Sequence, residues 1–178
     1  MKNQWGVGLV EVLVALVLLA IGVLGFTALQ LRAVDATGEA LTRSQAMLIL
    51  RGLTESMRVN PDGQSDYPAA VQKYMNLDSR PNGIKGECFD FGNSSFLECT
   101  STEMAHADAY VAVKEAARNG IRMTMTDCPG IGATIKRQCL FAAWGDTASK
   151  LKANDYSACM GSDGIYKFTA QCLMMEAY

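Results

Sequence analysis

The longest feature of the hydrophobic pattern is an apolar run near the start of the chain, from Gly6 to Arg32. It reads GVGLVEVLVALVLLAIGVLGFTALQLR, and Glu11 is its only charge before Arg32. These two charges lie 21 positions apart, about 31 Å along a helix with a rise of about 1.5 Å per residue. That length matches the hydrocarbon core of a bilayer. The pattern therefore predicts a membrane-spanning helix segment over residues 7–32.

The same helix is predicted to continue as an amphipathic helix over residues 33–60. One apolar stripe has the helical spacing i, i+4, i+7 and i+11: Ala46, Leu50, Leu53 and Met57. A second series repeats every seven residues: Val34, Leu41 and Leu48. The helix should end at Asn60, because a residue that precedes proline, here Pro61, is disfavoured in the helical conformation. The first stripe predicts that this half of the helix packs against the rest of the chain.

Residues 61–178 are predicted to form one globular head with two further helices. The first covers residues 67–75. The second, over residues 101–118, begins with a capping box in which Thr100 is the N-cap and Glu103 the N3 residue. The expected buried stripe of this second helix is Met104, Ala107, Val111 and Ala112. The only histidine, His106, falls on the other side and is expected to be exposed.

Three strands should follow, over residues 121–128, 135–144 and 165–176. The first shows the period of two that is typical of a half-buried strand, with these apolar positions: Ile121, Met123 and Met125. The last should present one apolar face: Tyr166, Phe168, Ala170 and Cys172. We therefore expect an α+β fold in which a small antiparallel sheet packs on the second half of the long helix.

The carboxylate of Glu11 separates three interpretations of the apolar run. A secretory signal peptide would have a shorter apolar region and a small-x-small cleavage site. A plain membrane anchor would have to bury Glu11 in lipid without a partner, which is costly. A cut after Gly6 would make Val7 the new N-terminus, with its amine about one helical turn from Glu11. The two charges could then compensate each other, within one helix or between staggered subunits.

The N-terminus resembles the class III (prepilin) leader of type IV pilins and of type II secretion pseudopilins. The resemblance rests on the short leader MKNQWG over residues 1–6, on Glu11 at the fifth mature position and on the long apolar helix. Two residues depart from the family pattern: Val7, where Phe is usual, and Gly8, where Thr is common. The resemblance implies the pilin fold, cleavage of the Gly6–Val7 bond by a prepilin peptidase, N-methylation of Val7, and a role for Glu11 in subunit assembly.

A second resemblance lies at the end of the long helix, in MLILRGLTESMRVNPDG. This segment is similar to one in PilV-type minor pilins at Leu53, Met57, Arg58, Asn60 and Pro61. It implies a minor pilin that helps to initiate type IV pilus assembly and enters the filament near its tip, supporting twitching motility and adhesion. The implied partners are other minor pilins, the major pilin and a tip adhesin. A helix end with a proline stop would need no such role, so both interpretations stay open.

Composition narrows these possibilities. The net charge is −2, the pI is near 5.4 and the basic residues are scattered, so nothing indicates nucleic-acid binding. A single histidine and the lack of a C-x-x-C motif argue against a zinc site. All six cysteines follow the apolar run, which favours three disulfides in an oxidising compartment. Sequential pairing, one of fifteen arrangements, is expected: Cys88–Cys99, Cys128–Cys139 and Cys159–Cys172.

The sequence contains no constellation of nucleophile, base and metal ligands, so we expect neither an enzyme nor a cofactor. The favoured interpretation is a minor pilin in the bacterial inner membrane, with its head in the periplasm, which then enters a pilus filament at the cell surface. The leader is equally compatible with a minor pseudopilin of a type II secretion system or with a major pilin. A membrane-anchored periplasmic enzyme or binding domain is the alternative from another class.

Processing at Gly6 is directly testable. N-terminal sequencing and intact mass measurement of the protein purified from membranes should find a chain that begins at Val7, with a methyl group on its amine. The six leader residues should be absent. A purified protein that still begins at Met1 would contradict the prepilin interpretation and favour a plain anchor.

Overall fold

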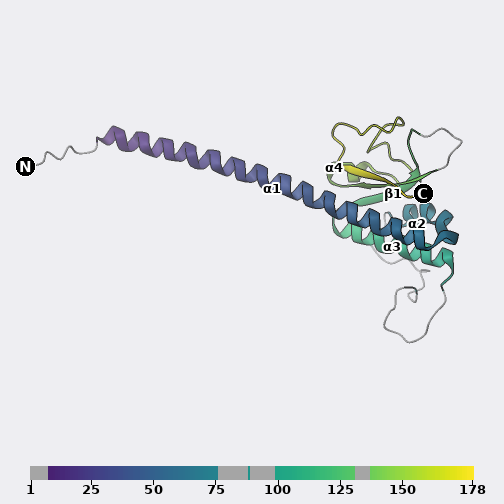
Figure 1. Cartoon of the computed structure of the whole chain (residues 1–178). Helices are drawn as coiled ribbons and strands as arrows, with labels where there is room; N and C mark the ends of the chain where they lie inside the picture. The colour runs from purple at the N-terminus through teal and green to yellow at the C-terminus, as the bar shows by residue number, and fades with distance from the viewer. Residues whose placement is uncertain (1–7, 76–87, 89–98, 131–136) are drawn as a thin grey trace, which may run out of the picture. The chain divides into compact units, whose positions relative to one another are not determined.

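The computed structural model describes residues 8–75, 88, 99–130 and 137–178. The chain divides into two compact units, Met1–Leu41 and Thr42–Tyr178. One long helix, α1 (Leu9–Val59), contributes to both of them (Figure 1). The second unit therefore begins inside the helix, whereas the sequence predicted a head that starts at residue 61.

Seven further elements follow α1 in the described ranges. They are η1 (Pro61–Asp66), α2 (Tyr67–Tyr74), α3 (Ser101–Arg118), β1 (Arg122–Asp127), β2 (Gln138–Ala143), α4 (Gly145–Lys150) and β3 (Cys172–Glu176). The strands form one antiparallel sheet with β2 in the centre. The α+β architecture expected from the sequence, a long helix with a small antiparallel sheet and further helices, is confirmed.

The apolar stripe on α1 is buried as predicted. Its four members are at most 2% exposed: Ala46, Leu50, Leu53 and Met57. They form the main core together with residues from α2, α3 and one face of the sheet. The second series lies outside this core and is 63–67% exposed: Val34, Leu41 and Leu48. The helix ends at Val59, and Pro61 begins η1, as the proline predicted.

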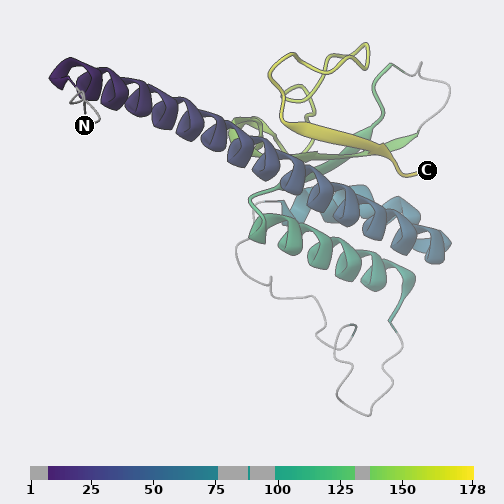
Figure 2. The same cartoon turned by 60° about the vertical axis from the view of Figure 1, so that its left-hand side comes forward.

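The sheet is covered on both faces. Leu140 and Ala142 of β2 face the main core, whereas the alternate residues Cys139 and Phe141 face a second core. In β1, Thr124 is fully buried, so the expectation of a half-buried strand is wrong. Figure 2 shows the reason: the helices lie on one side of the sheet, and the segment between β2 and β3 covers the other.

Helix α3 has the predicted ends but a different buried face. Thr100 Oγ1 accepts the N–H of Glu103 at 3.2 Å, and Glu103 Oε2 accepts the N–H of Thr100 at 3.0 Å, which completes the capping box. Met104 and Val111, expected to be buried, are 36% and 49% exposed. The buried residues are Ala105, Ala107, Ala109, Tyr110, Val113 and Ala116. The small alanines let α3 approach its neighbours closely, so the face that they occupy packs inward.

The last part of the chain departs most from the prediction. Strand β3 begins at Cys172 and not at residue 165, because the N–H of Ala170 donates to the Lys167 carbonyl at 3.0 Å in a turn. Phe168 is fully exposed and does not lie on a buried strand face. The short helix α4 was not expected from the sequence. The predicted strand over residues 135–144 corresponds to β2, and residues 131–136 lie outside the described ranges.

The burial of the α1 stripe gives a matched pair of variants. Leu50→Ala should lower the free energy of unfolding by about 2–5 kcal/mol, because Leu50 is fully buried and its truncation leaves a cavity. Leu48→Ala should change it by less than about 0.5 kcal/mol, because Leu48 is 66% exposed. Urea unfolding of the full chain in detergent, followed by near-UV circular dichroism, measures both. Equal losses would contradict the assignment of the buried face.

Candidate functional site

The predicted processing site, Gly6 and Val7, lies outside the described residues. The nearby Glu11 is in the first turn of α1, where its backbone N–H donates to the Gly8 carbonyl at 2.9 Å. The N-terminal end of a helix favours a negative charge, because its free N–H groups and its dipole point toward that end. Position 11 therefore suits a carboxylate on electrostatic grounds, and it lies one helical turn from position 7.

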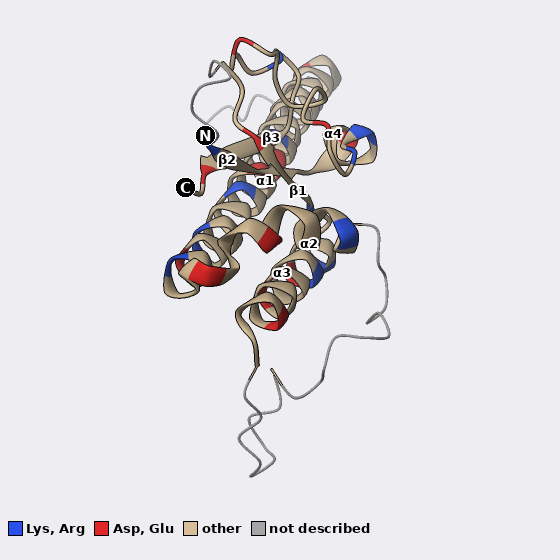
Figure 3. Ribbon diagram, turned by 90° about the vertical axis from the view of Figure 1, so that its right-hand side faces the viewer, with Lys and Arg blue, Asp and Glu red and all other residues tan. Residues whose placement is uncertain are grey.

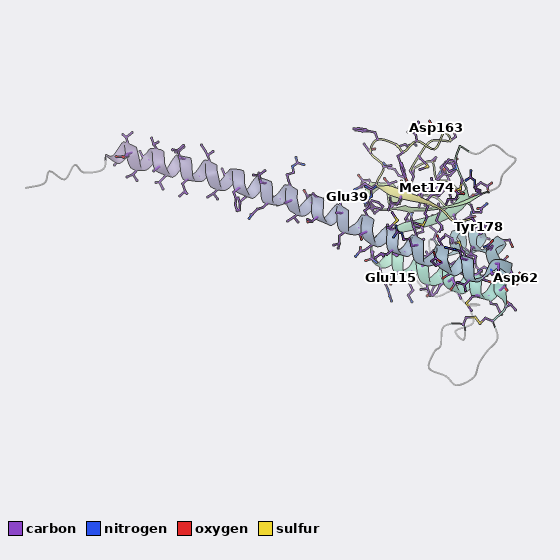
Figure 4. The ribbon with its side chains drawn as sticks, in the orientation of Figure 1. Glu39, Asp62, Glu115, Asp163, Met174 and Tyr178 are labelled. Atoms are coloured by element: carbon purple, nitrogen blue, oxygen red, sulfur yellow. A yellow bond between two sulfur atoms is a disulfide. The ribbon has the colours of Figure 1, made fainter. Side chains whose placement is uncertain are left out.

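The first half of α1 presents an apolar surface on all sides. Large apolar side chains from Leu9 to Leu31 are 48–78% exposed, and Figure 4 shows side chains projecting around this part of the helix. Among the residues that the structure describes, α1 is the one helix long and apolar enough to cross a membrane. Soluble monomers rarely expose so large a contiguous apolar patch. This surface therefore requires lipid or the apolar surfaces of other subunits.

Two of the predicted disulfides are present. Cys88 and Cys99 are bonded, with their Cα atoms 6.1 Å apart. Cys128 is bonded to Cys139 across a Cα–Cα distance of 4.9 Å. The backbone explains the second bond, because the N–H of Cys128 donates to the Arg137 carbonyl at 2.9 Å and extends the β1–β2 ladder. This bond therefore closes the hairpin at the end where the two strands are joined.

The remaining cysteines, Cys159 and Cys172, are buried thiols that line the second core. The carbonyl of Cys159 accepts the N–H of Lys167 at 2.9 Å, and Cys172 pairs with Ala143 in the sheet. The two side chains share a hydrogen bond, which together with burial raises the pKa of the Cys159 thiol. The third predicted pair is thus in contact, and its oxidation stays a prediction.

A polar cluster joins the end of α1 to α2 and α3. The Tyr67 hydroxyl donates to Asp108 Oδ2 at 2.6 Å, and Asn60 Nδ2 donates to the Ser101 carbonyl at 2.8 Å. Burial, reinforced by Asp108, raises the pKa of Tyr67. Burial also raises the pKa of the Asp108 carboxyl, against the opposite effect of the Tyr67 hydrogen bond. Asn60 therefore contributes a tertiary hydrogen bond in addition to ending the helix.

His106 is not exposed as the sequence suggested. Its Nδ1 lies 3.1 Å from the Tyr74 hydroxyl, the two rings meet edge to face, and the side chain is partly buried. Burial is the main cause that lowers the pKa of His106, and the charge of Lys73 acts in the same direction. The histidine is thus part of the contact between α2 and α3. Over the described ranges, no group of three His, Cys, Asp or Glu side chains could hold a metal ion.

The sequence did not identify the Tyr67–Asp108 contact or a groove between α1 and α3. The groove is lined on the α1 side by Ile49, Gly52 and Ser56, and it has a volume of about 450 Å³. The spacing i, i+3 and i+7 of these three residues was a signal for a second helix face. Two small residues among them made that face inconspicuous in the hydrophobic pattern.

These features define a class of protein: a subunit with an exposed apolar helix for lipid or other subunits and a small disulfide-bonded α+β head. Comparison with known families agrees. Residues 1–27 match the prokaryotic N-terminal methylation motif, and residues 28–110 match the family described as type IV pilin Tt1218. Together these matches support a type IV pilin with a prepilin leader motif and the pilin fold. No curated protein and no solved structure shows a significant match.

This placement has general consequences. Pilins are structural proteins and in general not enzymes. A prepilin motif implies processing by a prepilin peptidase and assembly with other pilins. The motif and the long apolar helix also indicate membrane anchoring followed by incorporation into a pilus.

The contact between Cys159 and Cys172 predicts a third disulfide in protein from an oxidising compartment. Alkylation of the unfolded, unreduced protein should label no cysteine, and peptide mapping should recover a peptide pair linked through Cys159 and Cys172. A Cys159→Ser/Cys172→Ser variant should melt several degrees lower than the oxidised protein, because it loses the closure of a short loop. Two alkylated cysteines at these positions in otherwise oxidised protein would contradict the prediction.

Proposed function

We propose that this chain is a minor pilin that helps to initiate type IV pilus assembly and enters the filament near its tip, supporting twitching motility and adhesion. The observation that carries the proposal is the apolar first half of α1, exposed on all sides behind a prepilin motif. Lipid covers this surface before assembly, and neighbouring pilin helices cover it afterwards. Because the apolar surface stays out of water in both states, transfer from bilayer to filament is energetically feasible.

Glu11 then sets the position of the subunit in the filament. A prepilin peptidase cuts the Gly6–Val7 bond and methylates the new Val7 amine. That amine is a cation at the end of an apolar helix, and it needs a negative partner once the helix is covered. Glu11 of an adjacent subunit supplies the partner only when the two helices are staggered, so the ion pair selects the stagger.

The covalent structure supports an exported head. Two disulfides, Cys88–Cys99 and Cys128–Cys139, are stable in an oxidising compartment and rare in the cytosol. We therefore place the anchor in the bacterial inner membrane and the head in the periplasm, before the subunit enters a filament at the cell surface. Its partners are the major pilin, other minor pilins and a tip adhesin.

The assignment to the minor, PilV-type class rests on the segment at the end of α1. Leu53 and Met57 of this segment are buried, and Asn60 makes the hydrogen bond to Ser101, so these residues also have structural roles. Arg58 is different, because its side chain is 70% exposed and contacts only Glu55 among the described residues, at 3.2 Å. Packing within the chain gives Arg58 no reason to be present, which favours a role in assembly.

Complementation of a deletion strain tests the proposal. Plasmid-borne wild-type protein should restore surface pili and twitching, whereas Glu11→Ala should reach the membrane in normal amounts and restore roughly tenfold fewer pili. The reason is that removing one partner of a buried ion pair costs about 3 kcal/mol or more. Asp35→Ala, which removes an exposed carboxylate from the same helix, is the matched control and should behave as the wild type.

Two outcomes would refute the proposal. If deletion leaves pili intact but abolishes secretion of exoproteins, the chain is a type II secretion pseudopilin. If Glu11→Ala restores full function and the leader stays uncut, the chain is a membrane-anchored binding domain or enzyme.

A further inference from the structure

The groove between α1 and α3 has the form of a helix-binding surface. Both of its walls are helical: Ile49, Gly52 and Ser56 on α1 face Asp108, Ala112 and Glu115 on α3. The lining is mainly apolar and includes Val111, which is 49% exposed. The groove lies entirely within the compact unit Thr42–Tyr178.

Small residues keep this groove open. A Cβ atom added to Gly52 would meet no atom within 4 Å, so nothing in the described chain fills the space above this residue. Ser56 follows Gly52 by one helical turn, and Ala112 lies on the opposite wall. Small residues at a helix surface allow another helix to approach closely, with its side-chain ridge in the groove.

An apolar face of α1 leads to the groove. Val34, Leu41 and Leu48 repeat every seven residues, so they lie on one face of the helix, and all three remain exposed. Gly52 follows Leu48 by four residues and therefore continues the same face. The surface that requires a cover over the first half of α1 thus extends along the helix to the groove.

The α3 wall adds a negative rim. The carboxylates of Asp108 and Glu115 are seven residues apart, which is about two helical turns. Glu115 accepts a hydrogen bond from Arg118 at 3.1 Å, and Asp108 accepts one from Tyr67. Figure 4 labels Glu115 on α3, and Figure 3 shows the acidic residues of this helix in red. An occupant of the groove should therefore be apolar along most of its length and carry a basic residue at one end.

We infer that this groove receives the apolar first half of the α1 helix of a neighbouring pilin subunit, with the basic residue that ends that apolar run placed against Asp108 and Glu115. The chain itself contains a segment of the required chemistry, in which Leu29 and Leu31 are exposed and Arg32 ends the apolar run. Because the groove and this segment are different parts of a subunit, the contact is head-to-tail and propagates along a filament. The inference rests on the proposed pilin function and identifies a surface on which it depends.

Site-specific photo-crosslinking of the full chain in filaments tests this inference. A photoreactive phenylalanine at position 111, in the groove, should crosslink to a peptide from the apolar first half of a pilin α1 helix, either in another pilin or in a second copy. The same probe at position 117 is the matched control, because Ala117 is an exposed residue of α3 outside the groove lining. It should give at least tenfold less of that product.

Two sets of variants show whether the groove is the receptor. Gly52→Leu should fold normally, because leucine has a higher helix propensity than glycine and the space above Gly52 is open. It should nevertheless reduce both the crosslink at position 111 and the amount of protein in sheared filaments by at least tenfold, whereas Ala117→Leu should reduce neither. The double variant Asp108→Asn/Glu115→Gln should reduce the crosslink several-fold.

The outcomes separate this inference from the function on which it rests. Wild-type protein absent from purified filaments would refute the pilin function and the inference with it. Wild-type protein present in filaments, but crosslinked from position 111 only to a globular head or to a non-pilin protein, would overturn the inference alone. The same conclusion would follow if Gly52→Leu left incorporation and crosslinking unchanged.

Discussion

The structure depends on one constraint: a single helix has to keep two different apolar surfaces out of water. The first half of α1 is apolar on every side, and no residue of the described chain covers it. The second half has only a stripe, from Ala46 to Met57, and the head buries this stripe completely. The change from one pattern to the other divides the chain into a part that needs external partners and a part that folds on its own residues.

The head is built around that stripe in two layers. Helices α2 and α3 complete the main core against one face of the sheet, and the segment between β2 and β3 forms the second core on the other face. The second layer contains little regular structure. A disulfide between Cys128 and Cys139 joins β1 to β2 at its border, and the thiols of Cys159 and Cys172 meet inside it. Covalent links therefore occur where the hydrophobic pattern is weakest.

The success of sequence reasoning followed the strength of the local signal. The stripe on α1, the stop at Asn60 and the capping box at Thr100 each depend on a few neighbouring residues, and each was correct. The buried face of α3 was wrong, because two sets of apolar residues both have helical spacing and only packing against α2 selects between them. The start of β3 was wrong, because the turn at Lys167 has no strong sequence signature.

The candidate site shows the same limit. Glu11 was found from the sequence, because a carboxylate inside an apolar run is a local anomaly. The groove beside Gly52 could not be found, because it depends on residues of α1 and α3 that are about 60 positions apart and that meet only in the folded head. The partner of Tyr67 was hidden for the same reason, since Asp108 lies 41 positions further along the chain.

The stripe on α1 also determines how the head would respond to mechanical load. In a filament under tension, force reaches the head through α1 and acts along the axis of this helix. The four stripe residues extend over three helical turns parallel to that axis. Their contacts would therefore be loaded together in shear, not peeled apart one after another. Such an arrangement resists pulling more strongly than the same contacts would resist separation from one end.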